Sequence, residues 1–279
     1  MDIQFTQTLS GTHLFYTTGC KSTQTSIKFC IANNSIFGLF HSSPIALYTF
    51  NQSHGKGQQD KIWEGLAGQN LAISIAFPLL DNLEYPLVVI NKAIAVAVRN
   101  ALQLFSSDLL FIKWPNDIVT DTHKICGLLM EVVSIANKKY FLLGIGVNVN
   151  QKSWDNQPKA VSLCSLNNAP IDMHSMLEPL LTGLVKAWSK TTIEFPLKDR
   201  ITAELSADFD RVLWHREKGI TLQMDTLFQK KNSINPSLVH EKNCFGGILL
   251  GVNDAGCIFI QLPSGDFGIF HHGEVRIVF

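Results

Sequence analysis

Two apolar runs at residues 109–112 and 124–131, joined by a short polar segment, constrain the fold of this chain most strongly. The segment opens with KWPND (residues 113–117), whose proline fixes its own φ angle and biases the preceding tryptophan toward extended geometry. The polar link that follows is typical of a hairpin, which would bring Lys113 and Lys124 together at one edge of a sheet. Two lysines beside neutral polar groups suit a polyanion such as a nucleotide. An ordinary hairpin with solvated lysines fits the same spacing.

The composition predicts a globular chain with one large domain and room for a small second one. The chain has 279 residues, of which 46% are hydrophobic, and a formal net charge of zero. A neutral balance gives no electrostatic reason to expect binding to nucleic acid or to an anionic membrane. The N-terminus lacks the basic and apolar regions of a signal peptide. The six cysteines include no C-x-x-C pair, which is typical of reduced thiols in a cytoplasmic protein and gives no spacing for a metal site.

The hydrophobic periodicity predicts both helices and strands. Residues 86–105 carry Lys92, Arg99 and Gln103 on one helical face, so this run is expected to be a mostly buried helix and not a membrane span. Residues 1–20 are turn-rich and mixed. Strands are expected at residues 45–50, 71–77 and 140–150, and helices at residues 25–32, 173–189 and 197–210. Short β-like runs from about residue 220 predict a small all-β domain, with a long polar loop at residues 230–243.

Two glycine-bearing segments could approach a ligand. In the polar loop at residues 51–63, Gly55 and Gly57 flank Lys56, and exposed backbone amides beside a lysine suit a phosphate. A flexible surface loop is the alternative, and the spacing is not that of a Walker loop. In the run at residues 140–150, Gly144 and Gly146 lie on the same face of the expected strand and leave room for something flat, although tight sheet packing explains them equally well.

The string KWPND, followed by K-x-x-G-x-L-x-E at residues 124–131, resembles the signature of the biotin–protein ligases. Other parts of the chain resemble that family too. They are the pair Ser22-Thr23, Gln52 ahead of the glycine loop, the pattern G-x-G-x-N at residues 144–148, and the glycine-bearing β-runs at residues 245–256 and 273–275.

This resemblance implies an α+β fold with two domains. Residues 1–216 would form a catalytic domain with a mixed β-sheet and helices on one side, the class II synthetase-like biotin–lipoate ligase fold. Residues 217–279 would form a small SH3-like β domain. The chain starts only about twenty residues before Ser22, where no winged-helix domain fits, so the resemblance does not imply a repressor that binds DNA.

The implied activity is that of a ligase that uses ATP to adenylate biotin and then transfers biotin to a lysine of a biotin carboxyl carrier domain. Lys124 is the catalytic candidate, because it would stabilise charge developing on the phosphate and carboxylate oxygens. The implied biotin contacts are Ser22, Thr23, Gln52, Gly55, Lys124, Gly127 and Gly144. The implied nucleotide contacts are Lys56, Gly57, Gln58, Trp63, Lys113, Asn116, Asp117, Gly146 and Asn148. Asp117 would orient the turn or help to hold Mg²⁺ that accompanies ATP.

One departure from the family pattern leads to a prediction. The loop usually reads G-R-G-R-R-G, whereas residues 55–60 read GKGQQD, so Gln58 lacks the guanidinium that would hold the phosphate and Asp60 adds a negative charge. Weaker retention of the adenylate is therefore expected. A lipoate or octanoate ligase, and a non-catalytic binder of biotin or nucleotide, stay open as alternatives, although the string WPND argues against the first. The expected partner is a carrier protein, with neither DNA nor membrane, and a homodimer is left open.

Overall fold

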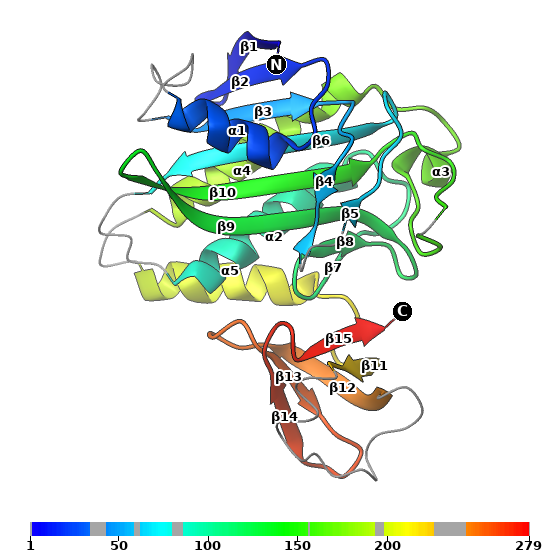
Figure 1. The fold of residues 1–279 in the computed structure, drawn as a ribbon. Coiled ribbons are helices and arrows are strands. Elements are labelled where there is room, and N and C mark those ends of the chain that lie inside the picture. Colours follow the sequence, from blue (N-terminus) through cyan, green and yellow to red (C-terminus); the bar gives the residue numbers. More distant parts are fainter. Residues whose placement is uncertain are drawn as a thin grey trace.

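The computed structural model describes residues 2–33, 43–58, 62–79, 86–155, 157–192, 198–225 and 244–278. The larger domain is built on an eight-stranded mixed sheet with the order β1-β2-β3-β6-β10-β9-β8-β7 (Figure 1). Strands β2 and β3 pair in parallel, and the other neighbours pair antiparallel. The strands are β1 (Ile3–Leu9), β2 (Thr12–Thr17), β3 (Ile45–Thr49), β6 (Asn70–Pro78), β7 (Phe111–Lys113), β8 (Asp117–Val119), β9 (Lys124–Ile135) and β10 (Lys138–Asn148).

Helices cover both faces of this sheet. Helix α1 (Thr23–Ala32) packs Ile27 and Ile31 onto one face, against Leu47 and Leu142. Helices α2 (Leu87–Gln103) and α4 (Leu177–Lys190) cover the opposite face, where the alternate residues of the same strands point, and α5 (Lys198–Arg211) packs against α2. The α+β class is confirmed. The expectation that helices lie on one side holds for α2, α4 and α5 but not for α1, because the central strands are apolar on both faces.

The N-terminal segment is more regular than its sequence indicates. Residues expected to be turn-rich form the antiparallel pair β1 and β2, joined by a turn in which Ser10 and Gly11 have φ angles of 49° and 79°. Strand β1 is an edge strand whose residues are nearly all solvent-exposed, so it carries no alternating apolar pattern for sequence reasoning to detect. The short α3 (Leu163–Asn167) and a 3₁₀ turn (Met173–Met176) precede α4, and Pro179 lies in the first turn of α4.

The C-terminal part forms a five-stranded antiparallel sheet with the order β14-β13-β12-β11-β15. Its strands are β11 (Gly219–Met224), β12 (Cys244–Val252), β13 (Ile258–Gln261), β14 (Phe267–Phe270) and β15 (Val275–Val278). Only β14 was not expected, since it is four residues long and follows directly on a turn. The loop expected at residues 230–243 lies outside the described residues.

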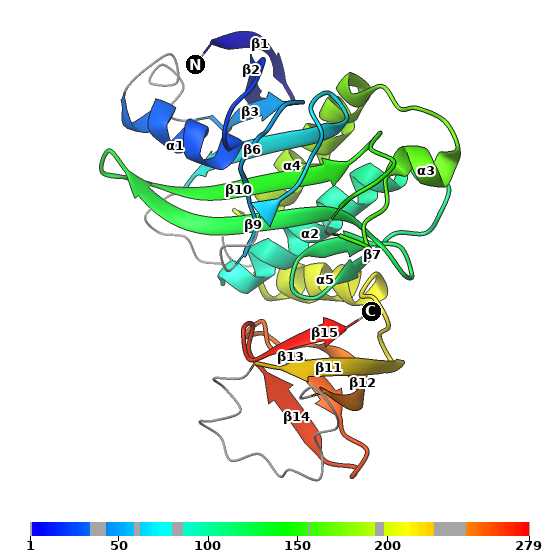
Figure 2. The ribbon, with the colours of Figure 1, turned by 45° about the vertical axis from the view of Figure 1, so that its right-hand side comes forward.

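Three contacts fix the small domain beneath the β7 edge of the large sheet (Figure 2). Nζ of Lys92, on α2, donates to the backbone oxygen of Val252 at 2.8 Å. Nε1 of Trp114 donates to the backbone oxygen of Gly256 at 3.0 Å. Lys92 is buried, and burial lowers its pKa even though two nearby carboxylates oppose that shift.

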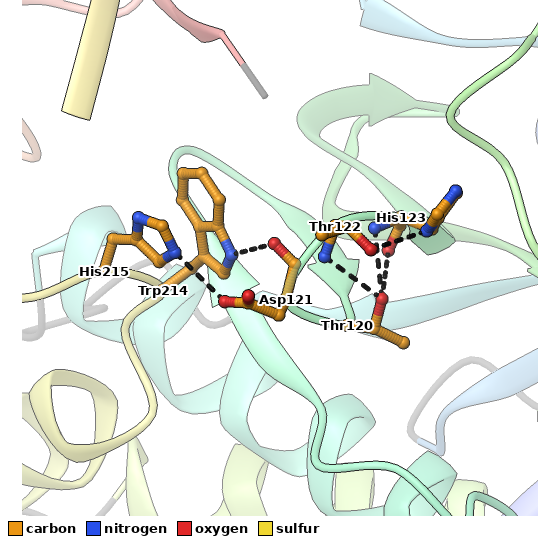
Figure 3. A network of polar contacts seen from close by, with 6 residues as sticks. All are labelled: Thr120, Asp121, Thr122, His123, Trp214 and His215. Carbon is orange, nitrogen blue, oxygen red and sulfur yellow. Dashed lines mark hydrogen bonds and ion pairs between the residues drawn. The ribbon is translucent and has the colours of Figure 1, made fainter.

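The third contact ties the link between the domains to the turn that precedes β9 (Figure 3). The backbone oxygen of Asp121 accepts a hydrogen bond from Nε1 of Trp214 at 2.9 Å. Oδ1 of the Asp121 carboxylate lies 3.0 Å from Nε2 of His215. Oγ1 of Thr120 accepts backbone N–H groups within the same turn. The turn that leads into Lys124 is therefore braced by the segment that leads into the small domain. No helix in the described ranges has both the length and the apolar character needed to cross a membrane.

Candidate functional site

A cavity of about 1110 Å³ lies between the large sheet and the small domain. It is lined by the start of α1, the β7–β8 turn, strands β9 and β10, and strands β11 and β15 of the small domain. Two short strands, β4 (Gly55–Lys56) and β5 (Ile62–Trp63), also border it. Of the residues expected from the sequence to form a site, all but Gly55 and Asn148 line this cavity. The expected residues that do line the cavity are Ser22, Thr23, Gln52, Lys56, Gly57, Gln58, Trp63, Lys113, Asn116, Asp117, Lys124, Gly127, Gly144 and Gly146.

Polar side chains converge at the start of α1. Ser22 caps the helix, because its hydroxyl accepts the backbone N–H of Thr25 at 3.4 Å. Oε1 of Gln52 accepts the backbone N–H of Thr23 at 2.8 Å and its hydroxyl at 3.2 Å. The Thr23 hydroxyl also lies 2.8 Å from that of Ser74, on β6. Buried polar groups with fixed partners of this kind can recognise a small polar ligand specifically.

This polar cluster continues through Ser74 and Gln24, which the sequence did not single out, to Glu131, which ends the K-x-x-G-x-L-x-E pattern. The hydroxyl of Ser74 donates to Oε1 of Gln24 at 3.2 Å, and Nε2 of Gln24 donates to Oε1 of Glu131 at 2.7 Å. Nζ of Lys28 lies 2.6 Å from the same carboxylate oxygen. Burial raises the pKa of Glu131, but hydrogen bonds from Lys28 and Gln24 and the charge of Lys28 outweigh it, so the pKa lies below its usual value.

Gly144 makes room for this arrangement. A Cβ atom at Gly144 would lie 2.2 Å from Oε1 of Gln24, a distance that no real side chain tolerates. The glycine therefore allows Gln24 to reach across β10 to Glu131. Gly55 has a comparable role, since a Cβ there would lie 2.5 Å from Nε2 of Gln52 and 2.8 Å from Cβ of Trp63. Gly55 thus allows Gln52 and Trp63, which line the cavity, to pack closely against its backbone.

The KWPND turn and the start of β9 meet on another wall of the cavity. Nζ of Lys124 lies 2.7 Å from Oδ1 of Asp117, and each side chain keeps about a quarter of its surface exposed. The side-chain amide of Asn116 donates to the backbone oxygen of Leu128, and the N–H of Leu128 donates to the backbone oxygen of Asn116 at 3.2 Å. The turn is consequently locked onto β9. Lys113 ends β7 directly opposite Asp117.

Asn148 is buried behind Lys124 and does not reach the cavity. Its side-chain amide donates to the backbone oxygen of Lys124 at 3.3 Å. The same backbone oxygen accepts the N–H of Val161 at 3.0 Å, and the N–H of Lys124 donates to the oxygen of Lys159 at 2.7 Å. These contacts fix the backbone that carries the lysine, so Asn148 helps to position Lys124 from behind the residues that line the cavity.

Two glycines form a flat platform beside Lys124. Gly127 and Gly146 face each other across β9 and β10, and the indole of Trp63 lies over both. A Cβ at Gly146 would lie 2.5 Å from Cε2 of Trp63, and one at Gly127 would lie 2.9 Å from Cζ3. Nζ of Lys124 is 5.5 Å from the centre of the same ring. Gly144 and Gly146 were expected to leave room for something flat. In this structure the indole of Trp63 covers Gly146, whereas Gln24 covers Gly144.

Positive charge predominates along the cavity. Its lining includes five cationic side chains, Lys56, Lys113, Lys124, Lys159 and Arg276, and three carboxylates, Glu64, Asp117 and Asp225. A chain with no net charge thus concentrates cations at one place, which favours an anionic ligand. Lys159 and Arg276 were not expected from the sequence. Asp60, whose negative charge was expected to weaken phosphate binding, lies outside the described residues.

Comparison with known proteins gives a consistent result. Residues 16–150 match the model of the biotin/lipoate A/B protein ligase family. The chain is 27% identical to the bifunctional ligase/repressor BirA of Bacillus spizizenii over 91% of this chain and 71% of that protein. It is 27% identical to the biotin–[acetyl-CoA-carboxylase] ligase of Mycobacterium tuberculosis over 50% of this chain and 52% of that protein. A structure of the biotin protein ligase of Aquifex aeolicus in complex with biotin and ATP superimposes with a TM-score of 0.70. That match has 21% identity and covers 95% of this chain and 98% of the other, so it demonstrates a shared fold.

Proposed function

We propose that this chain is a member of the biotin/lipoate A/B protein ligase family, and that it is a biotin–protein ligase that adenylates biotin with ATP and passes biotin to a carrier protein. The observation that carries the proposal is that both halves of the family signature meet in one cavity. Lys113, Asn116 and Asp117 come from the first half and Lys124 from the second. A cation-rich cavity with a buried polar pocket at one end suits a nucleotide beside a small polar molecule.

In the first step, an oxygen of the biotin carboxylate attacks the α-phosphorus of ATP, and pyrophosphate leaves. Lys124 would stabilise the negative charge that builds up on the phosphate oxygens, a contribution that preorganised cations make effectively in such sites. Asp117 holds the ammonium group within reach at 2.7 Å and keeps it oriented. Lys113 and Asn116 would position the nucleotide from the neighbouring turn.

In the second step, the neutral amine of an acceptor lysine attacks the carbonyl carbon of the biotinyl-AMP anhydride. A new amide bond forms, the bond to the phosphate oxygen breaks, AMP leaves, and the amine gives up a proton. Lys124 would again stabilise the charge on the oxygens. Neither step needs a nucleophile from the protein, and the side chains on this wall of the cavity supply cations and hydrogen-bond donors instead.

The polar cluster at the start of α1 is the proposed biotin end of the cavity. Ser22, Thr23 and Gln52 would hydrogen-bond the ureido ring, and Ser74 supports the Thr23 hydroxyl from β6 at 2.8 Å. A pocket built from such groups discriminates strongly against ligands that cannot satisfy them, such as lipoate. Lys56, Gly57, Gln58, Trp63 and Gly146 are assigned to the nucleotide end, next to Lys113 and Lys124.

Mg²⁺ is proposed to enter with ATP. The described residues contain no group of three His, Cys, Asp or Glu side chains placed to hold a metal ion. Magnesium bound to a nucleotide usually takes most of its ligands from phosphates and water, with one or two carboxylates. Asp117 fits that limited role, because it is the carboxylate beside Lys124, and the ion would neutralise part of the phosphate charge.

Several further assignments extend the proposal. The acceptor would be the biotin carboxyl carrier domain of a carboxylase, and the enzyme would act in the cytoplasm without binding DNA. Residues 3–17 supply strands β1 and β2 of the catalytic sheet, which supports a structural rather than a DNA-binding use of this segment.

We place the division between the catalytic and small domains at residues 216 and 217, next to the start of β11. A homodimer stays open.

A pyrophosphate-release assay tests the function directly. The purified protein with ATP and Mg²⁺ should release pyrophosphate when biotin is added, and much less with lipoate at the same concentration. A carrier domain should then gain biotin on one lysine, as mass spectrometry would detect. Faster release with lipoate would instead identify a lipoate ligase. Tight biotin binding without pyrophosphate release would identify a non-catalytic binder.

A further inference from the structure

The segment that links the two domains runs along the edge of the large sheet, beside β7. The backbone N–H of Ile112 donates to the oxygen of Val212 at 2.8 Å, and the N–H of Trp214 donates to the oxygen of Ile112 at 2.8 Å. Leu213 therefore pairs with Ile112 as a parallel bridge, and both Leu213 and Trp214 are buried. By pairing with an edge strand, the linker fixes the residue that precedes Lys113.

Trp214 makes a second contact, through its side chain, to the turn that precedes Lys124 (Figure 3). Its Nε1 donates to the backbone oxygen of Asp121 at 2.9 Å. The same turn is closed by the N–H of Thr120, which donates to the backbone oxygen of His123 at 2.8 Å. A buried indole whose N–H has a partner is fixed in orientation as well as in place. The indole therefore braces the turn three residues before the lysine.

One residue thus contacts both segments that carry lysines of the cavity. The backbone N–H of Trp214 holds Ile112, next to Lys113, and its indole holds the turn before Lys124. Both lysines line the cavity. Strand β8 lies between β7 and β9 and pairs with each of them, so the two lysines belong to strands that are not direct neighbours. The spacing of the lysines therefore depends on β8 and on the bracing by Trp214.

His215 holds the indole in this arrangement. Its ring stacks on that of Trp214, with ring centres 3.8 Å apart and an angle of 13° between the planes. Nε2 of His215 also lies 3.0 Å from Oδ1 of Asp121. The φ angle of His215 is 55°, in the left-handed region that few non-glycine residues adopt. Such a conformation persists where the surrounding contacts determine it, so the ring pair has one defined position against the turn.

We propose that Trp214 is a positioning residue for adenylation, which sets the spacing and orientation of Lys113 and Lys124 from the interdomain linker. The proposal rests on the function assigned above, because it requires Lys124 to act on the reacting phosphate. Trp214 is not among the described residues that line the cavity. Catalysis by positioned groups is sensitive to small displacements, and an error of about 1 Å can lower a rate by roughly a hundredfold. Loss of the indole contact should therefore lower the rate more than the affinity.

The first test is Trp214→Phe in the full-length chain, which keeps an aromatic ring and removes the N–H group. The single-turnover rate of adenylation should fall by roughly 10- to 100-fold, the scale expected when a catalytic group is displaced. The KM for ATP should rise by less than the rate falls. Biotin affinity, measured by calorimetry, should stay unchanged, because the polar cluster at the start of α1 does not depend on the linker.

Hydrogen exchange gives a second measurement that does not depend on activity. The amides of residues 118–124 should exchange faster in Trp214→Phe than in wild type, because the turn loses a contact that holds it closed. Trp188→Phe is the matched control. Trp188 is also buried, on α4, where it stacks on Phe77 with ring centres 4.6 Å apart. This control should lower stability without changing the adenylation rate or the exchange of residues 118–124.

Asp121→Ala provides a variant with little risk to folding, since this side chain is 72% exposed. It removes the contact with His215 and should change the rate and the exchange in the same direction as Trp214→Phe, by a smaller factor. Unchanged rate and exchange in Trp214→Phe, or the same rate loss in Trp188→Phe, would overturn the proposal. If Trp214→Phe does not fold, unchanged rate and exchange in Asp121→Ala would overturn it instead. A wild type without biotin-dependent activity would refute the proposed function, whereas the exchange measurement would still decide whether Trp214 holds the turn.

Discussion

Nζ of Lys124 lies 2.7 Å from Oδ1 of Asp117, across the pairing of β8 with β9. The aspartate closes the KWPND turn and the lysine opens the next strand, so the ion pair joins the two halves of the sequence signature. Both side chains are partly exposed to the cavity, which limits the contribution of the pair to stability. Its main consequence is geometric, because it holds the ammonium group at the wall of the cavity.

Replacement of Lys124 should therefore affect chemistry more than folding. Lys124→Ala should lower the rate of adenylation by about two orders of magnitude or more, the scale seen when one transition-state stabilising group is removed. Single-turnover measurements with saturating ATP and biotin would give this rate. Asp117→Asn should cause a smaller loss, because the lysine stays in place with a weaker partner. Near-normal single-turnover rates for Lys124→Ala would show that another group carries the chemistry.

Selectivity for biotin should depend on the Thr23 hydroxyl. Thr23→Val keeps the shape of the side chain but removes its hydrogen bonds with Gln52 and Ser74. Calorimetry should show biotin binding weakened by roughly tenfold or more, as expected when buried polar groups lose a partner. Thr25→Val is a matched control on the exposed side of the same helix. Equal biotin affinity for wild type and Thr23→Val would contradict the assignment of this pocket.

The glycine platform gives a prediction about packing. In Gly146→Ala the new methyl group would lie 2.5 Å from Cε2 of Trp63, so the indole must move. We expect a loss of about 1–3 kcal/mol in the free energy of unfolding, typical of overpacking, and a higher KM for ATP. In Gly219→Ala, at the exposed first residue of β11, no atom lies within 4 Å of the added Cβ. That variant should be as stable as wild type. Denaturant titrations of the two variants would reveal the contrast.

The elements that the sequence predicted well are those with a strong local signal. The cap at Ser22, the turn before Lys124 and the paired glycines of β10 each lie within a few residues of the pattern that predicts them. The expected pairing of residues 109–112 with residues 124–131 is wrong, because the short strand β8 lies between β7 and β9. These segments also carry most of the family resemblance. Periodicity and turn chemistry placed these elements, and it was the resemblance to the biotin–protein ligases that indicated most of the residues lining the cavity.

The parts that the sequence did not predict depend on long-range contacts. Ser74 and Gln24 are 50 residues apart in the chain, and Gln24 and Glu131 are 107 residues apart. Nothing in the local sequence distinguishes Ser74 or Gln24 from other strand or helix residues. The two side chains come into contact only in the folded sheet. Arg276 lies in a short alternating strand, where an exposed arginine is unremarkable. Only the docking of the small domain, through contacts such as Trp114 to Gly256, places it at the cavity.

The ion pair between Glu131 and Lys28 should make stability depend on pH. The pKa of Glu131 is lowered in the folded protein, so the ionised form is favoured by folding. This contribution is fully present above the ordinary glutamate pKa of about 4.3, and it is lost as the pH falls through the lowered value. Denaturation of wild type and Glu131→Gln from pH 7 to pH 3 should show a difference that shrinks toward acid. Lys28→Ala should move this loss to higher pH, and a difference that grows toward acid would contradict the prediction.

The last prediction concerns Gln58, which lines the cavity where the family pattern has an arginine. A charge-assisted contact to an anion contributes about 1.5–3 kcal/mol, so its absence should speed release of the adenylate by roughly ten- to a hundredfold. Gln58→Arg should slow that release, provided that Lys56 has not taken over the contact. The measurement is the dissociation rate of preformed biotinyl-AMP from wild type, Gln58→Arg and Lys56→Ala. If Lys56→Ala speeds release while Gln58→Arg changes nothing, Lys56 is the compensating cation. If neither substitution changes the rate, the loop does not contact the phosphate, and its resemblance to the family loop has no functional meaning here.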